Sequence, residues 1–303
     1  MIRTNLVLFS VTLLIIALGM IMVFNTTSAE VLDRSLAVST HLAFIKQIIY
    51  GLIGLLLAYF VWKVGYENLI RLSPYLFLAG NILLVLVFVP GIGQAINGAN
   101  RWIYIGGLSL QPSEIMKYLL PMYCIYRLQQ KPYPNWLDFY RQLLIFLIPL
   151  GLILMEPDNG ATIIILVTFM ILFFLKKIPL SYWAAPLIFV TLIGGVIAYQ
   201  MPHVPDRIRI YLHPEMDLRG RGHQPFQAKI AAGSGHVLGR GLGESLQKLN
   251  YLPEARSDYI AAIYAEEFGF VGILALLVLY SLIAVCGFYI AANAPTKEAY
   301  YLG

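Results

Sequence analysis

The sequence predicts an all-α, polytopic integral membrane protein, and three observations support this fold class. Hydrophobic residues make up 59% of the 303-residue chain and charged residues only 12%, and the mean hydropathy is +0.74. A soluble domain of ordinary composition carries about 25% charged residues. Long apolar runs alternate with short polar segments, and basic residues concentrate in alternate segments. We therefore expect a set of transmembrane helices.

Eight apolar runs are predicted to be helices that cross about 30 Å of hydrocarbon at about 1.5 Å per residue. A cleavable signal peptide is the alternative for the first run, because the small residues Thr27, Ser28 and Ala29 follow it. The run exceeds the apolar part of a normal signal peptide, so an uncleaved span is favoured. The predicted spans are Leu6–Phe24, Ile48–Trp62, Pro74–Val89, Ser113–Tyr126, Gln142–Met155, Ala161–Leu175, Pro179–Met201 and Tyr259–Ala292.

The basic residues predict the orientation of these spans. With a cytoplasmic amino terminus, the segments on the inner side carry nine basic and three acidic residues, as the positive-inside rule requires. The loop of residues 202–258 then lies on the outer face, and it is too long for its own charges to decide the topology. We therefore predict a multi-pass protein of the cytoplasmic (inner) membrane with its amino terminus in the cytoplasm.

Other classes of protein find little support in the residues. Cys124 and Cys286 lie within apolar runs, which argues against a disulfide framework or a thiolate metal site. The loop histidines match no zinc spacing, and the run G-R-G-L-G follows no predicted strand, which argues against dinucleotide binding. The net charge of +5 is explained by topology and lipid headgroups rather than by nucleic acid.

Three charged residues lie where the fourth predicted span meets the outer surface. Glu114 and Lys117 are three residues apart, so they share a helix face and can pair. An ion pair at the headgroup boundary is the structural explanation. Ionisable groups at membrane depth are costly and commonly face a cavity. With Arg101 just upstream, the alternative is a site for an anionic substrate.

A tight turn is predicted at Glu156-Pro157-Asp158-Asn159-Gly160, because proline and glycine favour one there. Aspartate in such a turn usually bonds the local backbone, which is the structural explanation for Asp158.

Three acids lie around the start of the last predicted helix. Asp258 belongs to its first turn, where an acid, or the neighbouring Ser257, caps a helix and complements its dipole. From the residues alone, capping is the favoured role of Asp258. Glu266 and Glu267 lie two turns further on and are predicted to make a helix–helix hydrogen bond.

Two stretches resemble the hallmarks of the SEDS family of bacterial cell-envelope proteins (FtsW, RodA and SpoVE). They are NGANRWIYIGGLSLQPSEIMK, residues 97–117, and GRGLGESLQKLNYLPEARSDYIAAIYAEEFG, residues 239–269. They occur in the family's order with a fitting hydrophobic map between them, so the resemblance covers essentially the whole chain. The S-x-Q-K-L-x-Y-L-P-E-A run is closer to the FtsW branch than to the RodA branch. We expect one SEDS-type transmembrane domain over residues 1–303 with a large loop at 202–258. Since the family usually has ten spans, we also expect this chain to be truncated at its carboxyl end.

The resemblance implies a peptidoglycan glycosyltransferase that polymerises lipid II into glycan strands at the outer face of the cytoplasmic membrane during cell division. The aspartate of the family's P-E-A-H-T-D-F motif corresponds to Asp258, here in P-E-A-R-S-D-Y, and is implied to be the general base of an inverting transfer. Arg101 and Lys117 are implied to neutralise the departing pyrophosphate. A divalent cation (Mg2+ or Mn2+) is a candidate helper, its ligands unknown, and no organic cofactor is expected.

The resemblance also implies further substrate-binding residues. Lys46 and Gln47 resemble a basic–Gln pair at the start of the family's second span. Asp158 lies in a turn that usually reads Q-P-D-L-G in the family and reads E-P-D-N-G here. Arg256 stands where the family's motif has histidine, and Glu114 accompanies Lys117.

Two other functions stay open for the same residues. A lipid II flippase would use the same membrane charges without needing a base. A non-catalytic divisome scaffold would instead activate a class B penicillin-binding protein. The expected partners are lipid II, such a transpeptidase and other divisome proteins, with no nucleic acid.

Overall fold

The computed structural model describes residues 2–34, 41–96, 99–130, 135–156, 158–185, 188, 192, 203–218, 220, 222–248 and 257–303. Most of these residues are helical, which confirms the predicted fold class. The chain forms two compact units. The first contains Met1–Leu57 and Leu192–Ala292, and the second contains Ala58–Thr191 and Asn293–Gly303.

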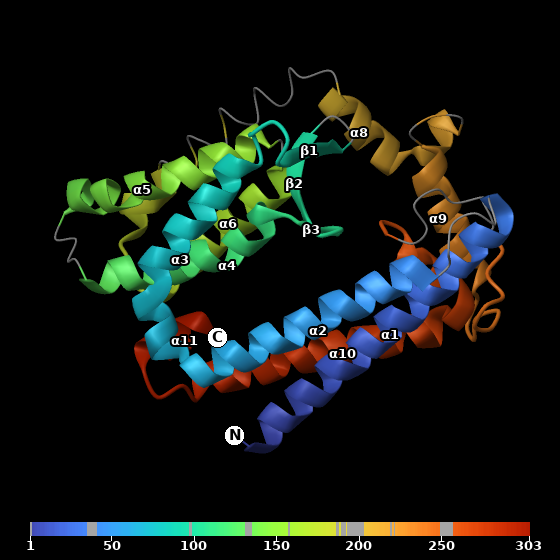
Figure 1. Cartoon of the computed structure of the whole chain (residues 1–303), viewed down its shortest axis with the longest axis horizontal. Coiled ribbons are helices and arrows are strands. Elements are labelled where there is room, and N and C mark those ends of the chain that lie inside the picture. The colour runs from blue at the N-terminus through green and yellow to red at the C-terminus, as the bar shows by residue number, and fades with distance from the viewer. Residues whose placement is uncertain are drawn as a thin grey trace. The chain divides into compact units, whose positions relative to one another are not determined.

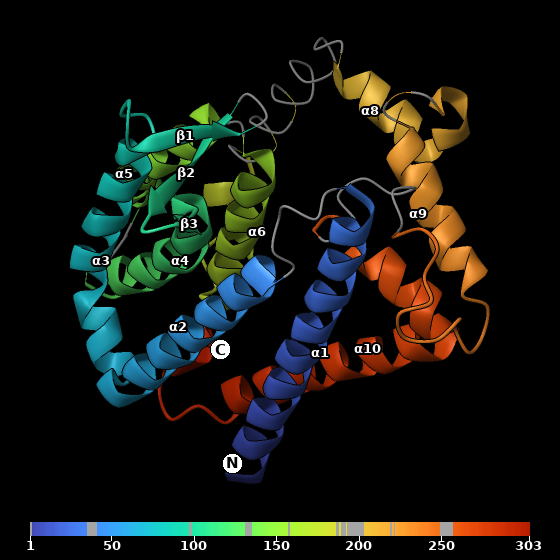
Figure 2. The same ribbon diagram turned by 45° about the vertical axis from the view of Figure 1, so that its right-hand side comes forward.

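Two long helices form the frame of the first unit. α1 (Ile2–Arg34) packs along α10 (Ile260–Ala292), with Met22 buried against Ile263 and Tyr264 (Figure 1). α10 is broken at Gly269, whose φ of 65° and ψ of −163° leave the helical region. Figure 2 shows the change of direction at this break. α2 (His41–Val64) also begins in this unit.

The loop of residues 202–258 contains helices that sequence reasoning missed. They are α8 (His203–Leu212), a short 3-10 helix η1 (Pro214–Asp217) and α9 (His223–Ser234), and α9 packs against α10 (Figure 1). The many glycines of this loop favour turns. α9 nevertheless fills the interval between Gly222 and Gly235 with Gln, Lys and Ala, which are good helix formers.

The second unit is a helical bundle with an aromatic core. It contains α3 (Tyr66–Leu86), α4 (Pro112–Gln130), α5 (Trp136–Met155), α6 (Asn159–Leu175) and the short α11 (Lys297–Leu302) (Figure 2). The ring of Phe77 stacks on that of Tyr123 with centroids 4.3 Å apart, and Phe139 meets Phe173 edge to face at 5.3 Å. These rings come from all four long helices and hold them together.

Along the chain, a three-stranded antiparallel sheet lies between α3 and α4. The sequence predicts only helices. Its strands are β1 (Gly93–Ile96), β2 (Ala99–Ile105) and β3 (Leu108–Leu110), with β2 in the centre. Gly106 and Gly107 join β2 to β3 with φ values of 59° and 84°. A two-residue hairpin loop requires such positive φ angles, so the Gly-Gly pair between apolar strands is the signal that was missed.

Within the described residues, five helices are long and apolar enough to cross a membrane, and each overlaps a predicted span. α6 is apolar but shorter, and α4 is less apolar than a typical span. Most of the predicted span Pro179–Met201 lies outside the described residues. The predicted number of eight spans is therefore not confirmed. The five helical segments are Arg3–Ser28, Leu42–Val64, Tyr66–Leu86, Trp136–Met155 and Ile260–Ala292.

Three predicted spans begin well inside a longer helix, namely at Ile48 in α2, at Pro74 in α3 and at Gln142 in α5. The sequence predicts a span that begins at Pro74, whereas α3 begins at Tyr66 and continues through Pro74. Only Gly65, with φ of 76°, separates α2 from α3. A glycine adopts this conformation without strain and redirects the chain within one residue. The polar stretch before Pro74 is therefore helix, and proline inside a membrane helix is tolerated.

Candidate functional site

Arg101 lies on β2 and reaches the turn between α5 and α6. Its Nε donates a hydrogen bond to the backbone carbonyl oxygen of Glu156 at 2.7 Å. Because β2 is paired on both sides, its backbone is held firmly. The sheet thus fixes a guanidinium group beside a turn that carries two acids, Glu156 and Asp158.

Glu156 is a residue of this turn that sequence reasoning missed. Its side chain is fully buried, and among the described residues neither carboxylate oxygen has a hydrogen-bond partner. Burial, helped by the charge of Asp158 and opposed by Arg101, raises the pKa of Glu156 to about 8. The Ser113 hydroxyl lowers the pKa of Glu156 only slightly, because it donates its hydrogen bond to Asp158. Glu156 is therefore mostly protonated at neutral pH. The only sequence signal was its departure from the family's usual glutamine.

Asp158 holds the same turn together. Its Oδ1 accepts a hydrogen bond from the Ala161 N–H at 3.1 Å and caps α6. Its Oδ2 accepts from Gln111 Nε2 and from the Ser113 hydroxyl, both at 3.0 Å. The predicted local backbone bond is confirmed, and the other two bonds tie the start of α4 to the start of α6. The substrate contact of Asp158 stays a prediction.

The expected pairing of Glu114 with Lys117 is confirmed on α4. Lys117 Nζ lies 2.7 Å from Glu114 Oε2. The Lys117 side chain is only 17% exposed and that of Glu114 is 54% exposed, so the lysine is the shielded member. Lys117 follows Ser113 by one turn and shares its helix face. The second unit thus brings Lys117 to the face of α4 that bonds Asp158.

The other predicted residues belong to the first unit or lie outside the described residues. Asp258 is exposed, in a turn two residues before α10 begins at Ile260. It therefore lies just ahead of the capping position. Lys46 and Gln47 are exposed near the start of α2. Arg256 is outside the described residues.

A buried carboxylate of α10 binds the glycine-rich loop of residues 235–248. Sequence reasoning did not predict this contact. Glu266 is fully buried and accepts hydrogen bonds from the Ser245 hydroxyl and from the N–H groups of Leu246 and Gln247. Arg240 adds an ion pair at 3.5 Å. The backbone N–H groups at these positions of the loop therefore bind the protein's own carboxylate.

Lys248 closes a second buried cluster. Its ammonium group donates to Glu267 Oε1 at 2.8 Å, to Asn25 Oδ1 at 2.9 Å and to the Gly243 carbonyl at 2.6 Å. Three acceptors for three protons satisfy a buried charge. Asn25 Nδ2 also donates to Glu267 Oε2 at 2.6 Å, which confirms the predicted helix–helix hydrogen bond. The available signal was Asn25 itself, the polar residue that ends the first apolar run.

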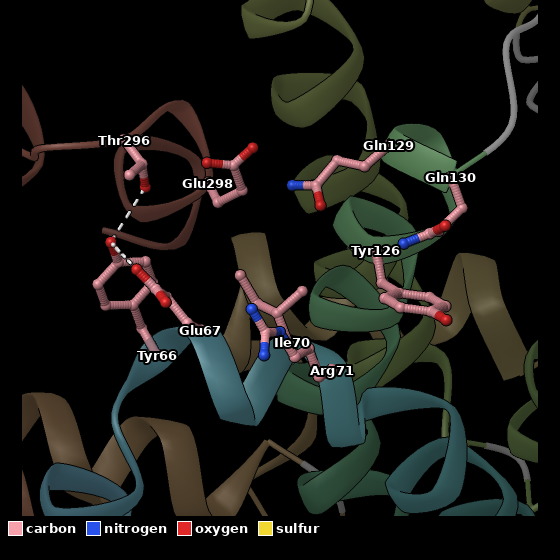
Figure 3. A pocket seen from close by; sticks show the side chains of 9 residues that line it. All are labelled: Tyr66, Glu67, Ile70, Arg71, Tyr126, Gln129, Gln130, Thr296 and Glu298. Carbon is pink, nitrogen blue, oxygen red and sulfur yellow. Dashed lines mark hydrogen bonds between the residues drawn. The ribbon is translucent and has the colours of Figure 1, made fainter.

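A polar cavity of about 240 Å³ lies elsewhere in the second unit, between α3, α4 and α11. Figure 3 shows Glu298 and Gln129 facing each other across it. The Thr296 hydroxyl donates to the Tyr66 hydroxyl at 3.3 Å on one side. Among the described residues, none of the predicted site residues lines this cavity. The wall consists of Tyr66, Glu67, Ile70, Arg71, Tyr126, Gln129, Gln130, Thr296 and Glu298.

The described residues do not form a protein-held metal site. Within that part of the chain, no group of three or more His, Cys, Asp or Glu side chains is placed to hold a metal ion. Mg2+ often needs only one or two carboxylates when substrate phosphates supply the other ligands. The predicted divalent cation therefore stays a prediction.

The apolar spans and the helical architecture define a polytopic α-helical membrane protein. A family model described as "Cell cycle protein", which covers FtsW, RodA and SpoVE, matches residues 5–302. The chain belongs to this family, so the resemblance inferred from the two motifs is confirmed.

Two curated relatives illustrate the similarity. The chain is 38% identical over 277 residues to the "Probable peptidoglycan glycosyltransferase FtsW" of Coxiella burnetii, covering 90% of this chain and 73% of that protein. It is 34% identical over 305 residues to the protein of the same name from Trichlorobacter lovleyi, covering 98% and 78%. These names agree with the FtsW branch that the sequence favours.

Two solved structures show the same fold. A chain of a peptidoglycan synthase complex superimposes with a TM-score of 0.74 at 24% identity, covering 100% of this chain and 81% of that one. The rod shape determining protein RodA of Thermus thermophilus gives a TM-score of 0.65 at 24% identity, covering 97% and 78%.

Proposed function

We propose that this chain is a peptidoglycan glycosyltransferase that polymerises lipid II into glycan strands at the outer face of the cytoplasmic membrane during cell division. Relatives at 34–38% identity carry glycosyltransferase names. The observation that carries the proposal is the exposed carboxylate of Asp258, which stands in the turn that leads into span α10. A base at the edge of a span can meet a sugar that is tethered to a lipid.

Asp258 acts as the general base. It takes the proton from the attacking sugar hydroxyl while that oxygen bonds to the anomeric carbon of the second sugar. The bond from that carbon to the pyrophosphate breaks, and the configuration inverts. General-base help of this kind contributes about 10²–10⁴-fold to the rate.

Arg101 and Lys117 supply positive charge to the departing pyrophosphate. Arg101 is oriented by its bond to the Glu156 carbonyl, and Lys117 is partly shielded from water. Shielding strengthens the attraction between a cation and a diphosphate. Glu114 orients Lys117, and Asp158 holds the adjoining turn. Lys46, Gln47 and Arg256 complete the proposed substrate-binding set.

Lipid II, a class B penicillin-binding protein and other divisome proteins are the proposed partners. A relative of known structure is a chain of a peptidoglycan synthase complex, which supports an assembly with a second enzyme. We place the protein in the cytoplasmic (inner) membrane with its amino terminus in the cytoplasm. Any Mg2+ or Mn2+ is expected to bind through the diphosphate of the substrate.

The test is polymerisation by the purified protein in detergent, where lipid II is freely accessible. Asp258→Asn keeps the shape of the side chain but cannot accept the proton, so we expect the rate to fall by about 10²–10⁴-fold. Glu244→Gln is the matched control, since Glu244 is another exposed acid of the same loop. It should polymerise at the parent rate.

The same variants separate the rival functions. Polymer formation that Asp258→Asn leaves unchanged would remove the proposed mechanism. A flippase forms no polymer in detergent, whatever residue stands at 258. A scaffold predicts that Asp258→Asn complements a deletion strain and still binds its transpeptidase.

A further inference from the structure

The glycine-rich loop of residues 235–248 exposes four aliphatic side chains within ten positions. They are Val237, Leu238, Leu242 and Leu246, hereafter the aliphatic patch, and each is more than half exposed, with Leu238 at 80%. Single exposed aliphatic residues are ordinary on protein surfaces. Four on one short polar loop are not, because each loses the stabilisation that burial would give.

The loop cannot hide these side chains by rearranging, because α10 holds its backbone. The N–H groups of Arg240 and Gly241 donate to the carbonyl oxygens of Glu266 and Glu267, both at 3.0 Å. Glu266 also binds the N–H groups at the far end of the loop. The patch is therefore a fixed feature of the surface.

Two helices place the edge of the hydrocarbon layer beside this loop. The charge-free apolar run of α1 ends at Phe24, and the next residue, Asn25, contacts Glu267 and Lys248. On α10, residues 270–292 carry no charge and extend about 34 Å at about 1.5 Å per residue, enough to cross the hydrocarbon. The apolar run of α1 thus ends, and that of α10 is interrupted by Glu266 and Glu267, at the level of the Asn25–Glu267–Lys248 cluster.

The patch begins where α10 becomes apolar. The N–H of Phe270 donates to the His236 carbonyl at 2.9 Å, and that of Val271 donates to the Val237 carbonyl at 3.1 Å. Phe270 and Val271 have exposed side chains at the start of the apolar stretch. The apolar surface of the span therefore continues onto the loop.

We propose that the aliphatic patch inserts into the membrane leaflet that borders this end of α1 and α10, so that the glycine-rich loop rests on the bilayer. The occupant is lipid rather than a partner protein, because the patch lies at the hydrocarbon edge and continues the surface of a span. Apolar side chains at this depth bury themselves at the boundary between headgroups and acyl chains. The proposal does not depend on the enzymatic activity.

Fluorescence quenching in nanodiscs tests this placement. A Leu238→Cys variant is labelled with the polarity-sensitive dye NBD in phosphatidylcholine nanodiscs that contain 5-doxyl or 12-doxyl phosphatidylcholine. Glu244→Cys is the matched control, because Glu244 is exposed and polar on the same loop. The native Cys124 and Cys286 are buried, and the unsubstituted chain measures their background labelling.

We expect the shallow 5-doxyl quencher to reduce emission at position 238 at least twofold more than at position 244. Aqueous iodide should show the opposite order, and 12-doxyl should quench less than 5-doxyl. Leu242→Cys repeats the measurement if the dye at 238 disturbs the protein.

Three outcomes would overturn the proposal. Equal iodide quenching at both positions without doxyl quenching would place the patch in water. Protection from both quenchers would mean that protein covers it. Stronger quenching by 12-doxyl than by 5-doxyl would place the loop inside the bilayer rather than at its edge.

Discussion

Glu156 differs in its chemistry from an ordinary glutamate. Its carboxyl is fully buried beside Asp158 and Arg101, and its pKa of about 8 exceeds the usual 4.5. The folded protein therefore binds a proton that the unfolded chain releases above about pH 4.5. Because the folded state holds the extra proton, the contribution of Glu156 to stability is greatest below that pH and falls as the pH rises toward 8.

Replacing Glu156 with glutamine, the residue usual in the family, should remove this pH dependence. Between pH 5 and pH 8.5 we expect the melting temperature of the parent protein to fall by several degrees more than that of Glu156→Gln. A change of 1 kcal/mol in stability corresponds to about 2–4 °C. Thermal unfolding in detergent, followed by tryptophan fluorescence, provides the measurement. Glu244→Gln, at an exposed acid, should follow the parent. Parallel curves for the parent and Glu156→Gln would show that Glu156 is ionised in the folded protein.

At the residue scale, the sequence predicts contacts that are close along the chain. Glu114 and Lys117 pair because three residues of helix bring them onto one face, and Asp158 caps the helix that follows it. The bond between Asn25 and Glu267 joins residues 242 positions apart. Helical periodicity carries no information about a partner at that distance, so the sequence suggests a helix–helix bond for Glu267 but not its partner.

At the element scale, α10 and the glycine-rich loop depend on Gly269. Its φ of 65° and ψ of −163° are accessible essentially to glycine alone, and strain in such regions costs about 1–3 kcal/mol for other residues. An added Cβ would also collide with the backbone of Val237, Leu238 and Gly239. The break in α10 and the docking of the loop are therefore one structural feature.

Gly269→Ala should destabilise the protein by at least about 1–3 kcal/mol and loosen the loop. Gly287→Ala in the same helix is the matched control, because a Cβ there meets no atom within 4 Å. Alanine favours helix over glycine by up to about 1 kcal/mol, so the control should be neutral or stabilised. Thermal unfolding and trypsin cleavage after Arg240 and Lys248 report the two effects. Equal melting and equal cleavage of both variants would contradict the requirement for glycine at 269.

Elements differ in how well the sequence predicts them. The apolar runs predict the membrane helices because hydrocarbon imposes both their length and their composition. The small sheet is missed because two of its strands have only four and three residues and it lies between two predicted spans. α9 is missed because flanking glycines dominate a run whose helix is stabilised by packing on α10. The predicted start of α3 is wrong because Pro74 was expected to begin the helix, whereas a membrane helix tolerates an internal proline.

At the scale of the whole molecule, composition and the order of two motifs are enough to predict the membrane class and the family. Both are properties of the sequence as a whole and do not depend on the placement of individual side chains. The orientation in the membrane rests on the distribution of basic residues alone. It decides which compartment Asp258 faces, and therefore whether the proposed transfer occurs outside the cytoplasm.

The predicted orientation places the glycine-rich loop outside and the junction of α2 with α3 inside. A membrane-impermeant maleimide applied to spheroplasts should therefore label Glu244→Cys directly, and Glu67→Cys only after permeabilisation. Both positions are exposed, so a difference in labelling reports sidedness rather than burial. The unsubstituted chain should stay unlabelled, because Cys124 and Cys286 are buried. The reverse pattern would put Asp258 on the cytoplasmic side, where glycan strands built by this protein could not join the wall.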